Sequence, residues 1–359
     1  MKSIHKQLIV KNSFPKSNVS INKLKSFHYG FGILKSYLAF LVIVSHQFKR
    51  NTTKNVLILR ITNNIGYHVP CFFILSFYFS FKNLLSIKKA NIINRFIRLL
   101  IPYFGWPIII LLINKIYNKI FDKKLPDTYE ALKSQLILGS TYINQFWFQW
   151  NLIVSTLFFL IIIFIFRKNF QFILILILIL FYYIQYSGNN FVNNLNLRKN
   201  DKFTVGRMFE MIPLGVTGLT LGHYDIINKL YTIKFQTFII SLLIYNLIRD
   251  YKIFSNIKGF YYQGIELNIR AVCIVFIFSL FPSEKIKNKF LIKILDLITH
   301  YSAGPFYLHL SLKAYLLNYN DNIKNGTFLG IIINYLICYN ISILGYKMFG
   351  KTFLKYLFC

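Results

Sequence analysis

The chain has 359 residues, of which 55% are hydrophobic, with 42 Lys and Arg against 11 Asp and Glu. This apolar content over several hundred residues excludes an ordinary soluble domain and favours a polytopic membrane protein. The formal net charge of +31 comes mainly from residues between the apolar runs, where Lys and Arg contact lipid headgroups, so it does not indicate nucleic-acid binding. The four cysteines form no close pair and have no His at metal-ligand spacing. We therefore expect neither disulfides nor a metal site.

The apolar runs predict an all-α fold, a transmembrane helical bundle of about ten spans, because no strand-like alternation persists through them. Residues 1–29 form a polar, basic leader without the apolar core of a signal peptide. A single transmembrane domain (30–350) and a short basic tail (351–359) follow, since no connection is long enough for a soluble domain. The predicted spans lie at 30–48, 66–84, 97–115, 146–166, 170–187, 207–223, 234–248, 267–282, 294–316 and 327–348.

An even number of spans would place both termini on one side of the membrane. Lys and Arg are almost evenly divided between the two sets of loops, so their count does not decide the orientation. The basic leader favours cytoplasmic termini. The membrane itself would be a bacterial inner or plasma membrane, or an endomembrane in a eukaryote.

The first predicted span carries two ionisable residues, Lys35 near its start and His46 at its end. Such residues are costly inside a bilayer and often mark a functional site. At about 1.5 Å per residue they lie roughly 16 Å apart along one helix, and a separation of eleven residues puts them on nearly the same face. The simpler interpretation is that Lys35 extends to the interface and that His46 ends the helix.

Arg95 and Arg98 precede the third apolar run, three residues apart. That spacing places both guanidinium groups on one helix face, where they would form a fork suited to a phosphate or carboxylate. The alternative is an anchor at the cytoplasmic membrane surface.

Two other spans carry polar residues near their starts. His68 opens the second span, where an interfacial position is the simpler interpretation and a contact with another polar group is the alternative. Glu210 follows Arg207 by one turn, so the two are expected to form an ion pair within the helix. A carboxylate at 210 that orients His46 is the alternative.

The ninth predicted span contains Asp296 and His300, four residues apart, and His309 further along. An acid and an imidazole on one helix face would suit a proton relay. The alternative is that the two side chains pair with each other, which would lower the free-energy cost of burying them.

Several short motifs in this order resemble the acyltransferase 3 family of integral-membrane O-acyltransferases, including members similar to fucose O-acetylases. The similarity extends over residues 30–350. The motifs are Lys35-x10-His46, HVPCFFILSFYFS, NRFIRLLIPYFGW, FWFQWNL, EMIPLGVTGLTLG and YSAGPFYLHL.

The resemblance implies ten transmembrane helices, acyl-CoA as donor without a metal, and a hydroxyl of a cell-surface or secreted glycan, or of a lipid-linked sugar, as acceptor. His46 matches the family's first-helix histidine and would be the catalytic base. Lys35 stands where the family has Arg, and with Arg95 and Arg98 it would bind the donor phosphates. His68, Glu210 and His309 are possible supporting residues.

Two other functions fit the same residues. A transporter or flippase of a lipid-linked glycan or another anionic solute would also need intramembrane histidines and arginines. An inactive family member that only binds a partner is the second alternative, and Lys35 in place of Arg is its main argument.

Overall fold

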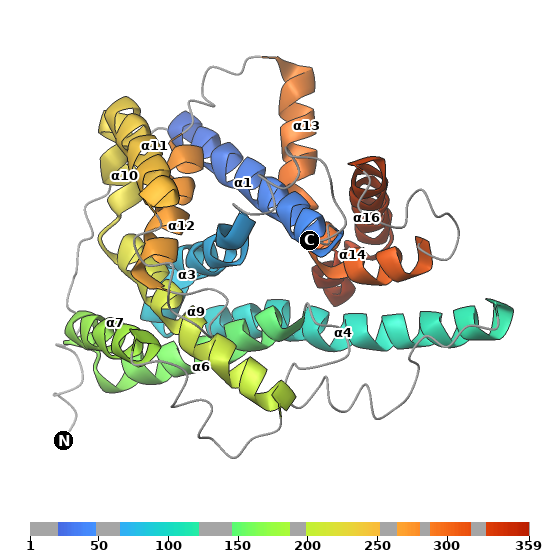
Figure 1. Cartoon of the computed structure of the whole chain (residues 1–359), viewed down its shortest axis with the longest axis horizontal. Coiled ribbons are helices and arrows are strands. Elements are labelled where there is room, and N and C mark those ends of the chain that lie inside the picture. Colours follow the sequence, from blue (N-terminus) through green and yellow to red (C-terminus); the bar gives the residue numbers. More distant parts are fainter. Residues whose placement is uncertain are drawn as a thin grey trace, which may run out of the picture.

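The computed structural model describes residues 21–47, 65–121, 146–186, 199–251, 264–280, 288–316 and 328–358. Every regular element in these ranges is a helix, which confirms the predicted all-α class (Figure 1). The elements are α1 (Ile21–Gln47), η1 (Ile65–Tyr67), α3 (His68–Ser86), α4 (Lys89–Phe121), α6 (Trp147–Ile165), α7 (Phe170–Tyr186), α9 (Lys199–His223), α10 (Ile226–Leu230), η3 (Tyr231–Ile233), α11 (Lys234–Tyr251), α12 (Gly264–Ser279), α13 (Lys289–His300), α14 (Ala303–Leu316), α16 (Phe328–Phe349) and η5 (Phe353–Leu357).

Each of the ten predicted spans overlaps a helix, but fewer helices have the length and apolar character of a membrane span. In the described ranges six stretches meet both criteria, and α7 is a shorter apolar helix. The six lie in α1, α3, α4, α6, α10 to α11, and α16. Polar and charged residues lower the hydropathy of α9, and α12 has only 16 residues. Such helices are tolerated in a membrane when neighbouring helices shield them from lipid.

The predicted span 294–316 is broken in two, because α13 ends at His300 and α14 begins at Ala303. Pro305 explains the break, since it has no N–H to donate to the carbonyl of Tyr301. A new helix starts instead, with Pro305 in its first turn, where an N–H is not needed.

The structure shows helices on both sides of the predicted transmembrane domain. α1 begins at Ile21, so part of the predicted leader is helical, while residues 1–20 lie outside the described ranges. Residues 353–357 of the predicted tail form η5, which is packed against α4 and α16. η5 is therefore part of the fold.

α3 lies inside the bundle, in contact with α1, α6, α9 and α12 (Figure 1). Its side chains Phe73, Ile74 and Phe77 have no exposed surface. α9 approaches α3 at Gly218, where a Cβ would lie 2.3 Å from the backbone oxygen of Ile74. Small residues that let two backbones approach are the usual means of packing helices in membranes.

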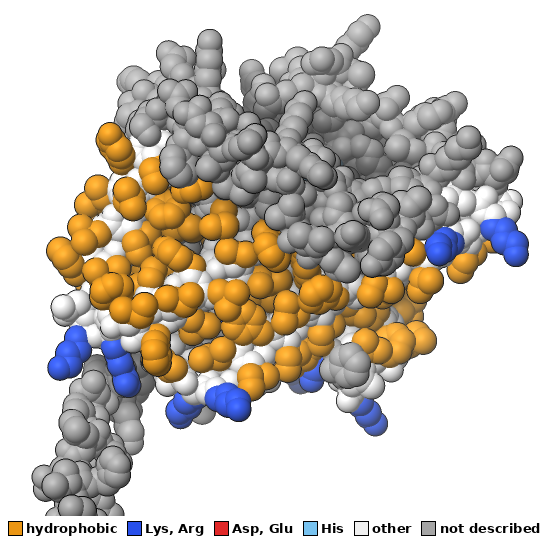
Figure 2. All heavy atoms as spheres, turned by 90° about the horizontal axis from the view of Figure 1, so that it is seen from below, with side chains coloured by type: hydrophobic (Ala, Val, Ile, Leu, Met, Phe, Trp, Pro, Cys, Tyr) orange, Lys and Arg blue, Asp and Glu red, His pale blue; other side chains and the backbone are white. Residues whose placement is uncertain are grey.

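The outer surface is apolar over a broad area, with Lys and Arg at its margins (Figure 2). Large exposed apolar side chains lie on α4, α6, α7 and α11, including Leu112, Phe164, Ile179 and Leu243. An apolar surface of this extent is unsuited to water and is suited to lipid. It agrees with a bundle that crosses a membrane.

Candidate active site

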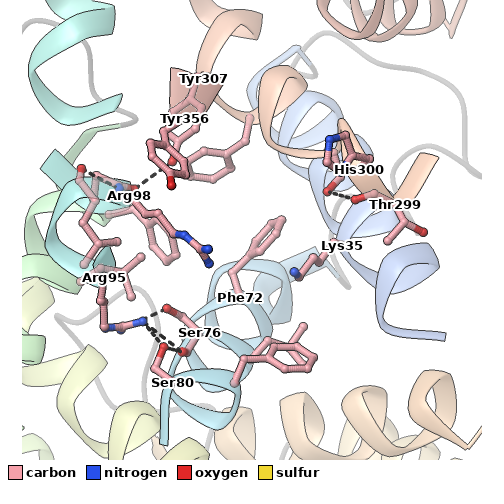
Figure 3. Close-up of a pocket in the computed structure, with 18 of the residues that line it drawn as sticks. Lys35, Phe72, Ser76, Ser80, Arg95, Arg98, Thr299, His300, Tyr307 and Tyr356 are labelled. Carbon is pink, nitrogen blue, oxygen red and sulfur yellow. Dashed lines mark hydrogen bonds between the residues drawn. The ribbon is translucent and has the colours of Figure 1, made fainter. Parts of the chain in front are cut away.

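A cavity of about 950 Å³ lies between α1, α3, α4, α6, α13, α14, α16 and η5. Four basic side chains line it: Lys35, Arg95, Arg98 and Lys355. They come from three separate parts of the chain, and Figure 3 shows the first three around the same space. The fold therefore brings together the three cations that the sequence predicted as donor ligands.

Lys35 reaches the cavity from the middle of α1. Its side chain is half-buried, with Nζ 5.2 Å from the centroid of the Phe79 ring. Figure 3 shows Lys35 and Arg98 directed into the cavity from opposite sides. Neither forms an ion pair with a described carboxylate. Asp296 also lines the cavity but pairs with neither cation. Four cations against one described carboxylate in a partly apolar cavity favour the binding of an anion.

Arg95 is held by the protein itself. Its Nε donates to Thr156 Oγ1 at 3.1 Å, and its two terminal nitrogens donate to the backbone oxygen of Ser76 at 3.4 Å, to Ser76 Oγ at 3.3 Å, and to Ser80 Oγ. The guanidinium carbon also lies 5.0 Å from the ring centroid of Phe77. Arg95 thus links α4 to α3 and α6, so most of its donors are used within the fold.

Arg98, one turn further along α4, has a different environment. Its side chain is exposed, and its guanidinium carbon lies 5.7 Å from the ring centroid of Tyr356. The two arginines therefore do not form the symmetrical fork that their spacing predicted. Arg98 presents its donors to the cavity, whereas Arg95 presents most of them to α3 and α6.

Aromatic side chains form another part of the cavity wall. The rings of Phe72, Phe148 and Phe306 contact one another, with centroids 5.2 to 6.2 Å apart. Beside them Tyr307 donates to Gln149 Oε1 at 3.0 Å, and Gln149 Nε2 donates to the Leu99 backbone oxygen at 3.0 Å. This wall suits an apolar or weakly polar chain and leaves the charged end of a ligand to the cations.

His46 lies at the far end of α1, where its ring contacts His309 of α14. The two ring centroids are 5.2 Å apart and the rings are tilted by 37°. His46 is exposed and His309 is fully buried. Neither histidine lines the cavity, but Phe306, one turn before His309 on α14, does. The histidine pair and the cavity are thus joined through α1 and α14.

The buried ring of His309 has a defined tautomer. Its Nδ1 lies 3.0 Å from the backbone oxygen of Pro305 and 2.9 Å from that of Phe306. Carbonyl oxygens only accept, so Nδ1 must carry the hydrogen and Nε2 is the basic nitrogen of the neutral ring. Asn334 of α16 donates to the backbone oxygen of His309 at 3.1 Å and fixes this part of α14.

Comparison with known families decides the class of this site. The acyltransferase 3 family, described as an acyltransferase domain, matches residues 28–347. The chain belongs to the acyltransferase 3 family. It is a multi-pass membrane acyltransferase, as the resemblance implied. No curated protein and no solved structure matches it.

Two of the possible supporting residues of this acyltransferase 3 protein, Glu210 and His68, do not line the cavity. Glu210 pairs with Arg207, with Nη1 and Oε2 2.8 Å apart, and both side chains are buried. Arg207 also stacks on Trp147, 5.2 Å from its ring centroid. The ion pair within α9, the simpler interpretation, is correct. His68, in the first turn of α3, is 4% exposed, so its side chain is packed within the bundle.

Asp296 and His300 both line the cavity but form no ion pair with each other. The His300 ring instead packs edge-on against Tyr346, with centroids 4.6 Å apart. The mutual pairing of these two residues that the sequence suggested is therefore not formed. The sequence also gave no reason to select Gln149, Tyr307 or Tyr356, because each is brought to the cavity by an element distant along the chain.

Proposed function

We propose that this membrane acyltransferase moves an acyl group, most simply acetyl, from acyl-CoA to a hydroxyl of a cell-surface or secreted glycan or of a lipid-linked sugar. The main support is the cavity in which Lys35 and Arg98 face each other and form no ion pair with a described carboxylate, including Asp296 of the same cavity. Coenzyme A carries several phosphate groups at one end and a thioester at the end of a long arm. A cationic cavity with an aromatic wall is suited to both parts of that molecule.

Lys35 and Arg98 would bind the phosphates, and Arg95 would hold α4 in the position that presents Arg98. The arm would then pass the aromatic wall formed by Phe72, Phe148 and Phe306 toward His46. Because α1 carries both Lys35 and His46, the two ends of the donor would lie against the same helix, roughly 16 Å apart.

His46 would act as the general base. Its imidazole accepts the proton of the acceptor hydroxyl while the hydroxyl oxygen bonds to the acyl carbon. The carbon–sulfur bond then breaks, and the proton passes to the departing thiolate of coenzyme A. His309, whose ring contacts His46, would keep the imidazole in position. No metal is needed for this reaction.

The proposed test measures acyl transfer from labelled acetyl-CoA in membranes containing His46→Ala. The rate should fall by about 10²- to 10⁴-fold, the usual contribution of a general base. His223→Gln is the matched control, since His223 packs between Phe81 and Phe170, away from the cavity. A His46→Ala rate within a few-fold of wild type would eliminate His46 as the base.

Photo-labelling with an acyl-CoA analogue separates this proposal from a transporter. Free coenzyme A should compete with the label, because both would occupy the cationic cavity. Absence of labelling, together with movement of a lipid-linked glycan across vesicles, would support transport instead. Mass spectrometry of surface glycans from a deletion strain would then identify the acyl group and its acceptor. For the location we propose a bacterial inner or plasma membrane, or a eukaryotic endomembrane, with cytoplasmic termini.

A further inference from the structure

The segment that follows α16 forms part of the cavity, although it lies outside the residues matched by the family. After α16 ends at Phe349, Thr352 caps the short helix η5, accepting a hydrogen bond from the Leu354 N–H at 3.2 Å. Two residues of η5, Lys355 and Tyr356, line the cavity. This part of the site therefore belongs to this chain and does not follow from the family match.

The end of this segment is firmly attached to the bundle. Trp106 of α4 donates from Nε1 to the backbone oxygen of Leu357 at 2.9 Å. The Phe358 ring stacks on Phe349 with an interplanar angle of 6°, and it packs edge-on against Trp106. Leu357 and Phe358 are only 4% and 7% exposed. The attachment fixes η5 beside the cavity.

A glycine in α16 makes room for this attachment. A Cβ at Gly345 would lie 2.2 Å from the Phe358 ring, so only glycine permits the ring to pack there. The packing of Phe358 is thus specific, because the two surfaces fit without a gap for a larger side chain.

Two cations lie close to the ring of Tyr356. The Arg98 guanidinium carbon lies 5.7 Å from its ring centroid, and Lys355 Nζ lies 5.2 Å from the same centroid. Both cations therefore share one aromatic ring at the cavity, where they also repel each other. A multiply charged anion in the cavity would remove that repulsion.

We propose that Lys355 binds a phosphate of the donor and that Tyr356 is a positioning residue, which holds the Arg98 guanidinium toward the same phosphates. The proposal rests on the proposed function, because it takes the cavity as the acyl-CoA site. It assigns part of donor recognition to the segment after α16, and it completes a set of cations from α1, α4 and η5.

The first experiment measures binding of coenzyme A and of phosphate-free pantetheine to detergent-solubilised protein. Lys355→Gln should weaken coenzyme A binding by about 10-fold, the value of one charge-assisted contact, and leave pantetheine binding unchanged. Lys355→Arg should keep most of the affinity. Lys351→Gln is the matched control, because Lys351 is exposed, precedes η5 and does not line the cavity.

The second experiment is a double-mutant cycle on coenzyme A binding with Arg98→Gln and Tyr356→Leu. If Tyr356 acts through Arg98, the double variant should bind little more weakly than Arg98→Gln alone. Additive losses would overturn the positioning role. A merely structural role of Tyr356 would lower the affinity for pantetheine as well, and this too would contradict the proposal.

The outcomes separate this inference from the proposed function. If wild-type protein does not bind coenzyme A, the proposed function fails. If wild type binds coenzyme A and Lys355→Gln binds it equally well, the proposed function stands and the role of Lys355 is refuted.

Discussion

Arg95 and Arg98 show how two identical residues on one helix face can have different tasks. Arg95 donates hydrogen bonds to Thr156, Ser76 and Ser80, whereas Arg98 extends into the cavity beside Tyr356. The difference arises because α3 and α6 offer oxygen acceptors at the position of Arg95 and none of these reaches Arg98. One arginine holds the helices together, and the other is available to a ligand.

This difference leads to opposite effects of substitution. Arg95→Ala should lower the stability of the solubilised protein by about 2–4 kcal/mol, because it removes several hydrogen bonds and leaves acceptors unsatisfied. Arg98→Gln should leave the melting temperature nearly unchanged and weaken coenzyme A binding by about 10-fold. Thermal unfolding and a binding assay on both variants would check this. Equal melting temperatures would contradict the structural role of Arg95.

Three of the residues singled out from the sequence share one cavity, but the sequence did not predict the partners of these residues. Lys35 stands out because a charge inside an apolar run is costly, and Arg95 and Arg98 stand out because their spacing places both on one helix face. The fold brings all three to one cavity. The contact between His46 and His309 was not predictable, since 263 residues separate them along the chain. Long-range neighbours depend on how the helices pack, which the spacing of residues within one helix does not specify.

At the scale of single elements, the glycines of α9 determine its packing against α3. Gly218 allows the α9 backbone to approach the backbone oxygen of Ile74, because any Cβ there would lie 2.3 Å from that oxygen. Backbone atoms cannot turn aside as a flexible side chain can. The two helices would have to separate to admit a larger residue.

Gly218→Leu should therefore destabilise the protein by about 1–3 kcal/mol, the cost of overpacking a close contact. Gly66→Ala is the matched control, since the nearest atom to a Cβ there, in Leu267, is 3.8 Å away. The yield of folded protein and the melting temperature in detergent are the measurements. An unchanged melting temperature in Gly218→Leu would refute the close approach.

A predicted element boundary differs from the structure where apolar content suggests a continuous helix but the backbone cannot continue one. The run 294–316 is apolar enough to suggest one span, yet Pro305 divides it into α13 and α14. The short basic tail predicted at 351–359 contains η5. Its apolar residues Leu357 and Phe358 are nevertheless buried.

The bundle as a whole has two ends that can be distinguished. α3 and α6 run in the same direction, since Phe148 contacts Phe73 and Phe159 contacts Phe77. The turns that follow these helices, at Lys88 and Lys168, therefore lie at one end. η5 reaches Arg98 near the start of α4, so Lys351 lies toward the same end.

Cysteines introduced by Lys88→Cys, Lys168→Cys and Lys351→Cys should all react with an impermeant thiol reagent from one side of oriented vesicles. Lys119→Cys, near the other end of α4, should react from the opposite side. Cys71, Cys273 and Cys338 are buried and should contribute little background, and Cys359, which lies outside the described residues, is replaced by Ser in every variant. With cytoplasmic termini, the first three positions face the cytoplasm. Labelling of Lys88→Cys and Lys168→Cys from opposite sides would contradict the arrangement of α3 and α6.

A single continuous helix, α1, carries Lys35 at the cavity and His46 against His309. Lys35 would hold the donor's phosphates and His46 would be the base. The distance between these two residues along α1 therefore does not vary with loop motions. Such a fixed spacer would select donors by the reach of their arm: acetyl phosphate is too short to occupy both points at once, whatever its reactivity. An acyl group on a carrier of the correct length would be accepted even if its carboxyl part differed by a few carbons.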